Sequence, residues 1–228
     1  MRLLFLALLS ANALAEPSCM ATSSAQAPTL VELYTSEGCN SCPPADRWLS
    51  KLPRDGSVIP LAFHVDYWDY LGWRDRFGSA QFSERQRQQL RINGSRFPYT
   101  PQVVVDGRDK RDWYAVRELP RTTAPFQLQL RRQGKEVLAE LASASTVPLN
   151  GWWFVSQSGH RTPVKAGENR GVMLDHDHVV VQQQAVGALA AGTTALRFAP
   201  QQAGDVTLVL TDVRTGKPIQ ALRLSCPA

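Results

Sequence analysis

The sequence has no second C-x-x-C pair and contains only four cysteines and four histidines. A structural zinc site usually draws its four ligands from two such pairs, or from one pair and two histidines. Here Cys39 and Cys42 form the single C-x-x-C pair, and His176 and His178 are the only closely spaced histidines. A zinc knuckle is therefore not expected, and we predict neither a metal site nor another cofactor.

Long apolar runs are also scarce. After residue 14 no segment approaches the roughly 20 apolar residues that a membrane-spanning helix needs. Residues 1–15 begin with Arg2, continue as an apolar run and end in the small-x-small site Ala13-Leu14-Ala15, which is typical of a secretory signal peptide. No lipid-attachment box precedes Cys19. The sequence therefore predicts a soluble exported protein, periplasmic or secreted, without stable membrane insertion after the signal is cut.

An excess of one charge sign is nearly absent, since the formal net charge is only +5 at pH 7. The densest basic patch spans residues 74–96, which contain six arginines and only two acidic residues, Asp75 and Glu84. No nucleic-acid-binding motif accompanies these charges, and a solvated helix face explains them. We expect no nucleic acid among the partners.

The first half of the chain has the pattern of an α/β protein. Mostly apolar runs predict buried strands, and amphipathic runs between them predict helices. The expected strands cover residues 29–35, 58–65 and 101–106, and the expected helices cover residues 45–52 and 79–92. Asn93-Gly94 is a typical helix end, because Gly supplies the left-handed cap. Alternating strands and helices favour a largely parallel sheet.

From about residue 122 the pattern changes to short strands with Gly-rich turns, which favours an antiparallel β-sandwich. The expected strands cover residues 126–130, 137–141, 152–155 and 178–183, with a hairpin of residues 206–210 and 219–224. We therefore predict a signal peptide (1–15), an N-terminal spacer (16–28), an α/β domain (29–121) and an all-β antiparallel sandwich domain (122–228).

The cysteine pair follows an expected strand and opens an expected helix, with Pro43 suited to its first position. A purely structural disulfide here would stabilise little, because so short a ring constrains the unfolded chain least. Free N–H groups of the first turn and the helix dipole favour a thiolate. These features favour redox chemistry, with Cys39 as the more exposed, nucleophilic sulfur and Cys42 as the resolving thiol.

The order strand, C-x-x-C, helix, then Tyr99-Thr100-Pro101 before another strand resembles the thioredoxin fold. That resemblance implies a cis bond before Pro101, close to the cysteine pair, and pairing of the Thr100 backbone with a substrate chain. More narrowly, residues 33–46 (LYTSEGCNSCPPAD), 63–73, 99–107 and 167–171 (GENRG) resemble DUF1223, a family of exported bacterial proteins grouped with thioredoxin-like proteins. The resemblance implies a thioredoxin-like α/β domain and a compartment, and no established activity.

Other polar residues could bind a substrate near the cysteine pair or transfer protons to it. Asp66, Tyr67 and Trp68 leave the second strand at its carboxyl end, where open α/β sheets bind ligands, so they could line a substrate groove or pack under a long loop. Glu32 is a candidate for the buried carboxylate that relays protons in thioredoxin-like enzymes. His64 is better explained as a core histidine than as an acid–base group.

Two further pairs complete the candidates. Cys19 and Cys226 lie near the two ends of the mature chain, and a disulfide between them would close ~200 residues, worth ~5 kcal/mol in the chain-entropy account. His176 and His178 would share one face of a strand. Two imidazoles make a weak metal site, so a hydrated sheet face or a domain contact is favoured.

The leading hypothesis is an exported thiol–disulfide oxidoreductase acting on a thiol or disulfide partner, for which we expect a protein. One alternative is a non-catalytic ligand- or protein-binding module, and another is soft-metal binding by the C-x-x-C thiolates. An exposed Cys39 sulfur with a lowered pKa favours chemistry. A buried sulfur favours the binding module.

Overall fold

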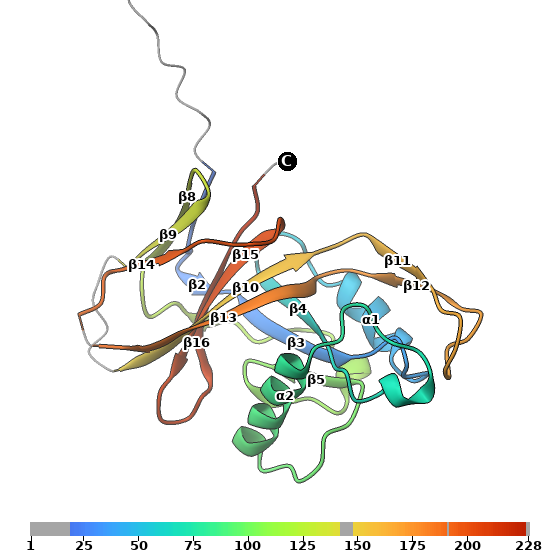
Figure 1. Ribbon diagram of the computed structural model, residues 1–228. Helices are drawn as coiled ribbons and strands as arrows, with labels where there is room; N and C mark the ends of the chain where they lie inside the picture. Colours follow the sequence, from blue (N-terminus) through green and yellow to red (C-terminus); the bar gives the residue numbers. More distant parts are fainter. Residues whose placement is uncertain (1–18, 142–147, 191, 227–228) are drawn as a thin grey trace, which may run out of the picture.

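The structure is a computed structural model that describes residues 19–141, 148–190 and 192–226. The expected signal peptide, residues 1–15, lies outside the described residues. A mixed eight-stranded sheet in the order β16-β15-β10-β13-β4-β3-β5-β6 forms the body of the molecule (Figure 1). Its strands are β3 (Thr29–Thr35), β4 (Val58–His64), β5 (Gln102–Val105), β6 (Arg108–Asp109), β10 (Leu149–Gln157), β13 (Val179–Leu189), β15 (Asp205–Asp212) and β16 (Pro218–Leu224).

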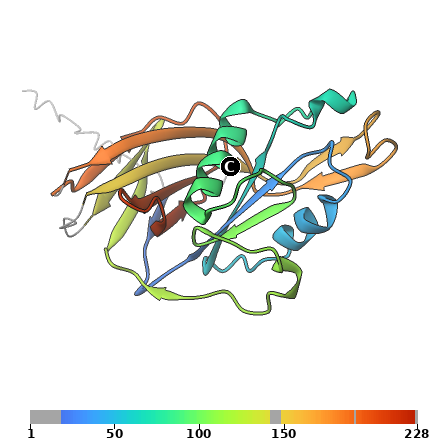
Figure 2. The same ribbon diagram turned by 90° about the horizontal axis from the view of Figure 1, so that it is seen from below.

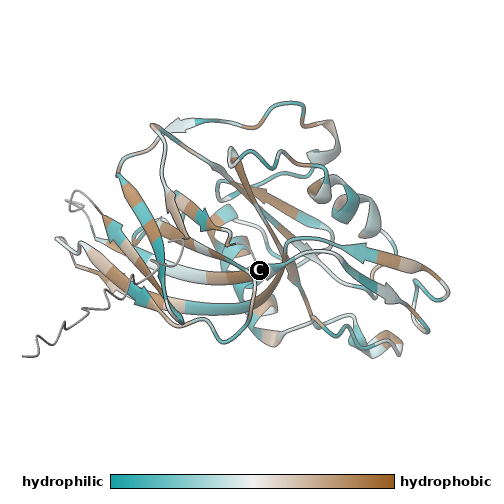
Figure 3. Cartoon of the chain, turned by 90° about the horizontal axis from the view of Figure 1, so that it is seen from above, coloured by the Kyte–Doolittle hydropathy of each residue, from teal (hydrophilic) through white to brown (hydrophobic). Residues whose placement is uncertain are grey.

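The middle of this sheet is a βαβ unit made by β3, α1 (Pro43–Ser50) and β4. The two strands pair in parallel, and all seven residues of each are buried. Ala45 and Leu49, one helical turn apart, are the buried residues of α1 and pack on the face of the sheet that carries Val31 and Leu33. Figure 3 shows the hydrophobic residues concentrated along these central strands.

The second helix, α2 (Ala80–Asn93), begins and ends where its capping residues predict. The hydroxyl of Ser79 accepts a hydrogen bond from the backbone N–H of Gln81, and Gly94 closes the helix with a φ of 66°. Gly is favoured there because a side chain is strained in the left-handed region. Two short 3-10 helices complete this half: η1 (Asp69–Leu71) lies between β4 and α2, and η2 (Trp113–Ala115) follows β6.

A smaller sheet, in the order β1-β8-β9-β14, covers the antiparallel end of the large one. It contains β1 (Met20–Thr22), β8 (Leu128–Gln133), β9 (Glu136–Leu141) and β14 (Ala195–Phe198). Alternate side chains of both layers meet in one apolar cluster, in which the rings of Trp153 and Phe198 stack 5.1 Å apart. β1 comes from the segment that the sequence marks as a spacer, and so does β2 (Gln26–Ala27), which pairs with β7 (Thr122–Thr123).

The prediction of a thioredoxin-like α/β domain followed by a separate β-sandwich domain is wrong. The described residues are mainly strands, with two α-helices, and β13 from the C-terminal half pairs in parallel with β4. The N–H of Ala62 donates to the carbonyl of His178 across this junction at 2.8 Å. A fully buried β4 needs a partner on its free edge, and the one strand within residues 107–121, β6, pairs with β5 instead. Strands from the C-terminal half fill that place.

A third, two-stranded sheet is a hairpin of β11 (His160–Pro163) and β12 (Met173–His176). It projects from the large sheet toward α1, as Figures 1 and 2 both show. The sequence did not predict either strand. Among the described residues, no helix is long and apolar enough to cross a membrane.

Candidate functional site

The cysteine pair lies in the loop that connects the end of β3 to the start of α1. Cys39 and Cys42 form a disulfide, with their Cα atoms 5.4 Å apart. Cys42 is the N-cap residue, and Pro43 is the first residue of the helix. The sequence therefore placed the pair correctly at the beginning of a helix.

The predicted exposure of the Cys39 sulfur is wrong. Cys39 is 1% exposed and Cys42 is 0% exposed, so neither sulfur is uncovered. Residues 164–172, the tip of the β11–β12 hairpin, include the GENRG motif and hydrogen-bond to the cysteine loop; we call this segment the cap.

Three hydrogen bonds hold the cap on the cysteine loop. The side-chain amide of Asn169 donates to the carbonyl oxygens of Glu37 at 2.8 Å and Cys39 at 2.9 Å. The carboxylate of Glu168 accepts from the backbone N–H of Asn40 at 3.1 Å. Asn169 is buried and Glu168 is exposed. Side chains of the cap thus contact main-chain atoms of Glu37, Cys39 and Asn40 in the cysteine loop.

The helix start offers fewer donors to the sulfurs than the sequence analysis assumed. Pro43 and Pro44 carry no N–H, and the next donor, Ala45, bonds the carbonyl of Cys42 at 2.9 Å. The hydroxyl of Ser41 lies 3.4 Å from Sγ of Cys39. Stabilisation of a thiolate by free N–H groups of the first turn is therefore not available here, because two prolines occupy it.

The predicted substrate residues do not all lie at one place. The bond between Thr100 and Pro101 is cis, as the resemblance implied. The indole N–H of Trp68 donates to the Thr100 hydroxyl at 2.8 Å, and Cβ of Trp68 lies only 3.0 Å from where a Cβ on Gly38 would be. Trp68 and Thr100 are thus connected to each other and to the cysteine loop. Their role in binding a substrate stays a prediction.

Asp66 contacts α2, whereas the Tyr67 hydroxyl lies beside Gln86 and Thr100. The carboxylate of Asp66 accepts from the hydroxyl of Ser83 in α2 at 2.6 Å, which fixes the loop to the helix. Burial raises the pKa of Tyr67 to about 12, so its hydroxyl stays protonated at neutral pH. Both residues explain the packing of the loop after β4, and a contact with substrate through them is untested.

Four buried titratable side chains surround the loop, and we call them the acid–base cluster: Glu37, His64, Asp75 and His176. Nδ1 of His64 lies 2.7 Å from the Asp75 carboxylate, and Nε2 of His176 lies 3.2 Å from the Glu37 carboxylate. The two imidazole rings are 5.1 Å apart. The same Asp75 oxygen accepts from the Glu37 backbone N–H at 2.9 Å, which links the two pairs.

Charge pairing decides the protonation of the first pair. Burial alone would lower the pKa of His64, but the Asp75 carboxylate outweighs it and the pKa is raised. Burial alone would raise the pKa of Asp75, yet His64 keeps it lowered. His64 is buried, as predicted for a core histidine, whereas the sequence did not single out Glu37 or Asp75 as site residues. The signal that could have found them is position: Glu37 is two residues from Cys39, and His64 ends the strand beside β3.

Glu32 does not face the cysteine pair. It is fully buried in a salt bridge with Arg85 of α2, at 2.7 Å, and Gln89 donates to its other oxygen at 3.4 Å. The guanidinium of Arg85 also lies over the rings of Phe63 and Phe154. This carboxylate therefore ties α2 to the sheet and is not placed to relay protons to the sulfurs.

The two neighbouring histidines have separate environments, contrary to the strand-face prediction. β12 ends at His176, and His178 has a φ of 58°, which no strand residue adopts. His178 is buried, and burial together with Arg223 lowers its pKa to about 4. Within the part of the chain that is described, no group of three or more His, Cys, Asp or Glu residues could hold a metal ion.

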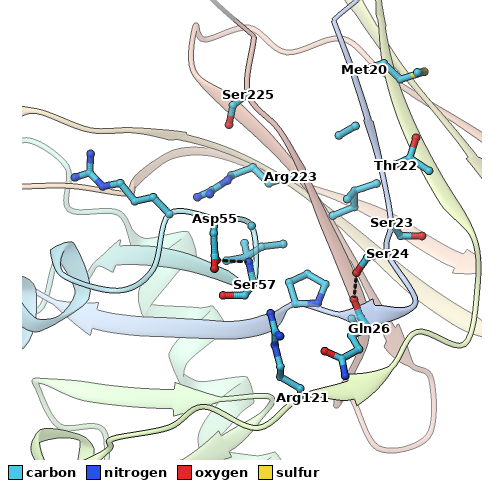
Figure 4. A pocket seen from close by; sticks show the side chains of 17 residues that line it. Met20, Thr22, Ser23, Ser24, Gln26, Asp55, Ser57, Arg121, Arg223 and Ser225 are labelled. Atoms are coloured by element: carbon cyan, nitrogen blue, oxygen red, sulfur yellow. Dashed lines mark hydrogen bonds between the residues drawn. The ribbon is translucent and has the colours of Figure 1, made fainter.

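Two features lie away from the cysteine pair. Cys19 and Cys226 form the second disulfide, which joins the strand β1 region to the end of β16. A hollow of about 490 Å³ lies nearby, lined by residues 20–28 and by Arg121 and Arg223 (Figure 4). It includes Ser57, at the start of β4, whereas the cysteine pair lies at the opposite, carboxyl end of the parallel β3. The hollow is thus remote from the cysteine pair.

Comparison with known proteins identifies the family. The chain matches the family described as "Protein of unknown function (DUF1223)" over residues 30–211, and it belongs to that family. Its structure is similar to that of protein AGR_C_4864 from Agrobacterium tumefaciens, with 27% sequence identity and a TM-score of 0.72 over 86% of this chain and 93% of that one.

A second solved structure, HBP35 of Porphyromonas gingivalis, is similar in fold alone. Its sequence identity is 14%, and the TM-score is 0.56 over 89% of this chain and 76% of that one. None of the curated proteins matches this chain.

Proposed function

We propose that this protein is a thiol–disulfide oxidoreductase, exported to the periplasm or secreted, whose Cys39–Cys42 disulfide exchanges with the thiols or disulfides of a partner protein. The disulfide itself carries the proposal. It closes a ring across a sequence separation of 3, whereas the second disulfide spans 207 residues. Because short rings stabilise least, the smaller disulfide has little structural value, and reactivity is the better reason for it. Two disulfides also suit an oxidising compartment.

The chemistry follows the exchange mechanism of a dithiol pair. A partner thiolate attacks Sγ of Cys39, the bond to Cys42 breaks, and its electron pair leaves on the Cys42 sulfur. The partner's second thiolate then attacks the partner sulfur of this mixed disulfide, which forms the partner disulfide and leaves Cys39 and Cys42 reduced. In the reducing direction the Cys39 thiolate attacks a partner disulfide, and the Cys42 thiolate then attacks Sγ of Cys39, which releases the second partner thiolate and re-forms the Cys39–Cys42 disulfide.

Exchange requires the buried sulfurs to become accessible, and we expect the cap, which is hydrogen-bonded to their loop, to move. Three hydrogen bonds from Glu168 and Asn169 hold it. A hydrogen bond contributes about 1 kcal/mol net, so release of the three costs about 3 kcal/mol. Local openings of this size are common in folded proteins. A partner that replaces the Asn169 bonds with its own backbone would lower the cost further.

The burial of both sulfurs favours a second candidate function. In that account the pair is inert, and the protein is a binding module for a ligand or another protein. Accessibility of the disulfide in the folded state separates the two functions.

Trapping tests the proposal. A Cys42→Ala variant expressed in cells should accumulate mixed disulfides through Cys39, seen as thiol-sensitive bands, and Cys39→Ala should accumulate fewer. The purified wild type should reduce insulin with a dithiol as electron source. Absence of both trapped partners and insulin reduction would support the inert module.

A further inference from the structure

The hollow beside the disulfide of Cys19 and Cys226 lies where the two sheets meet at their edges. β1 is an edge strand of the smaller sheet, and β16 is an edge strand of the large one. Met20, next to Cys19, and Ser225, next to Cys226, both line the hollow, so the disulfide joins two of its walls. Its volume of about 490 Å³ falls within the roughly 300–1,000 Å³ of ordinary small-molecule sites.

Among the described residues, three arginines line the hollow, and they come from segments that are far apart in the chain. Arg54 follows α1, Arg121 precedes β7, and Arg223 belongs to β16. In the view of Figure 4, the side chains of Arg121 and Arg223 lie on either side of Asp55. Asp55 is the one carboxylate in the described lining, so the hollow carries an excess of positive charge.

The protein itself neutralises these arginines poorly. In the part of the chain that the structure describes, neither Arg54 nor Arg121 has a carboxylate within 4.0 Å, and Arg223 has one long contact, with Asp205 at 4.0 Å. The carboxylate of Asp55 accepts instead from the backbone N–H of Ser57 at 2.9 Å. A guanidinium presents its N–H donors in a fork that matches carboxylate and phosphate oxygens, so these groups are suited to bind an anion.

A neighbouring histidine is subject to the same positive charge. The pKa of His178 is lowered to about 4, first by burial and then by Arg223 and Arg54. Asp177 and Asp205 oppose this effect, and neither of them lines the hollow. Arg54 and Arg223 are thus close enough to act together on one buried group, as they would on an anion between them.

The buried part of the lining is apolar, which restricts the kind of anion that fits. Ala27, Ile59 and Leu222 are the buried residues of the described lining. The polar side chains, among them Ser57 and Ser225, are partly or fully exposed and lie nearer the opening. A ligand that fills the hollow therefore combines anionic oxygens with a hydrocarbon part, since burial of apolar surface stabilises the complex.

We propose that this hollow is a binding site for a small organic dianion, namely a phosphate monoester or a dicarboxylate with a short hydrocarbon part. The anionic oxygens bind Arg54, Arg121 and Arg223, and the hydrocarbon part contacts the buried apolar residues. Two negative charges balance the lining, in which three arginines accompany one carboxylate. The site is separate from the proposed thiol–disulfide exchange, because the hollow is remote from the cysteine pair.

Isothermal titration calorimetry of the folded, full-length protein in low-salt buffer at pH 7 tests the site. The probes are phenyl phosphate and adipate, with phenol and adipamide as their neutral analogues. We expect one-to-one binding of at least one dianion and of neither neutral analogue. Binding of phenyl phosphate alone assigns the site to phosphate monoesters, and binding of adipate alone assigns it to dicarboxylates. Inorganic phosphate, which has no hydrocarbon part, should bind at least about tenfold more weakly than the dianion that binds.

Variants of the arginines place the binding in the hollow. Arg121→Gln and Arg223→Gln should each weaken it by about tenfold, because each loses charge-assisted hydrogen bonds to the anion. Arg121→Lys keeps the charge without the fork and should weaken it less. Arg96→Gln, which changes an exposed arginine outside the lining, is the matched control and should bind as wild type does. Circular dichroism confirms that each variant is folded.

Three results would overturn the inference. In the first, neither dianion binds the wild type. In the second, Arg121→Gln and Arg223→Gln bind as tightly as Arg96→Gln. In the third, inorganic phosphate binds as tightly as the organic dianion, which would show that the apolar residues contact no ligand. None of these results bears on the exchange chemistry of the cysteine pair, so the proposed function stands or fails separately.

Discussion

The side-chain amide of Asn169 donates a hydrogen bond to the carbonyl oxygen of Cys39 at 2.9 Å, although 130 residues separate the two in the chain. The same amide also bonds the carbonyl of Glu37. One buried side chain of the cap therefore fixes the position of the loop that carries the cysteine pair. Access to the disulfide should depend on this contact more than on any residue of the loop itself.

Asn169→Ala should open the cap. The substitution removes two of the three hydrogen bonds that hold it, about 2 kcal/mol, which corresponds to a roughly 30-fold higher population of the open form. The rate of Cys39–Cys42 reduction by dithiothreitol should rise by a similar factor. Arg170→Ala, which changes the exposed neighbour, is the matched control and should leave the rate unchanged. Equal rates for both variants would show that the cap does not limit access.

Glu168→Gln should make Cys39 more acidic once the pair is reduced. The Glu168 carboxylate accepts from the Asn40 N–H, and its negative charge beside the loop disfavours a thiolate. Glutamine keeps an acceptor and removes the charge. Because Glu168 is exposed, the thiol pKa should fall by less than about one unit, and added salt should shrink the difference. The pH dependence of thiolate absorbance at 240 nm measures it; an unchanged pKa would remove Glu168 from the electrostatics of the pair.

Arg85→Met should destabilise the fold by about 3–5 kcal/mol, because it leaves the Glu32 carboxylate buried without a partner. Both side chains are at most 5% exposed and they contact at 2.7 Å. A Glu32→Gln/Arg85→Met double variant should recover much of the loss, since it removes the unpaired charge. Urea unfolding gives both free energies. A double variant as unstable as Arg85→Met would indicate that the packing of Arg85 on Phe63 and Phe154 matters more than its charge.

His178 should make the fold sensitive to acid. Its folded pKa of about 4 lies below the ordinary 6.5, so the unfolded chain binds the proton more readily between these values. The stabilising contribution is complete above pH 6.5 and is lost as the pH falls toward 4, by roughly 3 kcal/mol in total. His178→Asn tolerates the positive φ and should flatten this dependence. Unfolding by urea at pH 7 and pH 5 measures the difference; parallel losses in both proteins would contradict it.

Removal of the disulfide between Cys19 and Cys226 should cost about 2–5 kcal/mol of stability. A Cys19→Ala/Cys226→Ala variant should nevertheless reduce insulin at the wild-type rate, because this disulfide is far from the cysteine pair. If a variant that remains folded lost insulin reduction, the redox chemistry would belong to the disulfide between Cys19 and Cys226 and not to the Cys39–Cys42 pair.

The local elements could be predicted from the sequence, and the long-range pairings could not. The βαβ unit around Cys39, the caps of α2 and the C-terminal hairpin follow from apolar periodicity and from residues such as Ser79 and Gly94. Parallel pairing of β13 with β4 leaves no local signal, because the apolar start of β13, Val179–Val181, does not specify which strand it pairs with. The sequence therefore suggested two domains where one sheet spans both halves.

The same limit applies to the site. The positions of Cys39 and Cys42 could be predicted because their spacing is local. The cap and His176 reach the pair from more than 120 residues away on a hairpin of short, polar strands, which the hydrophobic pattern does not reveal. His176 of the acid–base cluster and the hydrogen bonds of the cap both depend on that hairpin, so neither could be predicted from the sequence.

The most direct test of the proposed function is a redox titration of the folded wild-type protein. The protein is equilibrated in glutathione or dithiothreitol buffers of stepped potential, alkylated and analysed by mass spectrometry, with circular dichroism to confirm that it stays folded. The account predicts that Cys39 and Cys42 become alkylated together at a defined potential while Cys19 and Cys226 remain oxidised. Alkylation of Cys39 and Cys42 only under conditions that unfold the chain would contradict it.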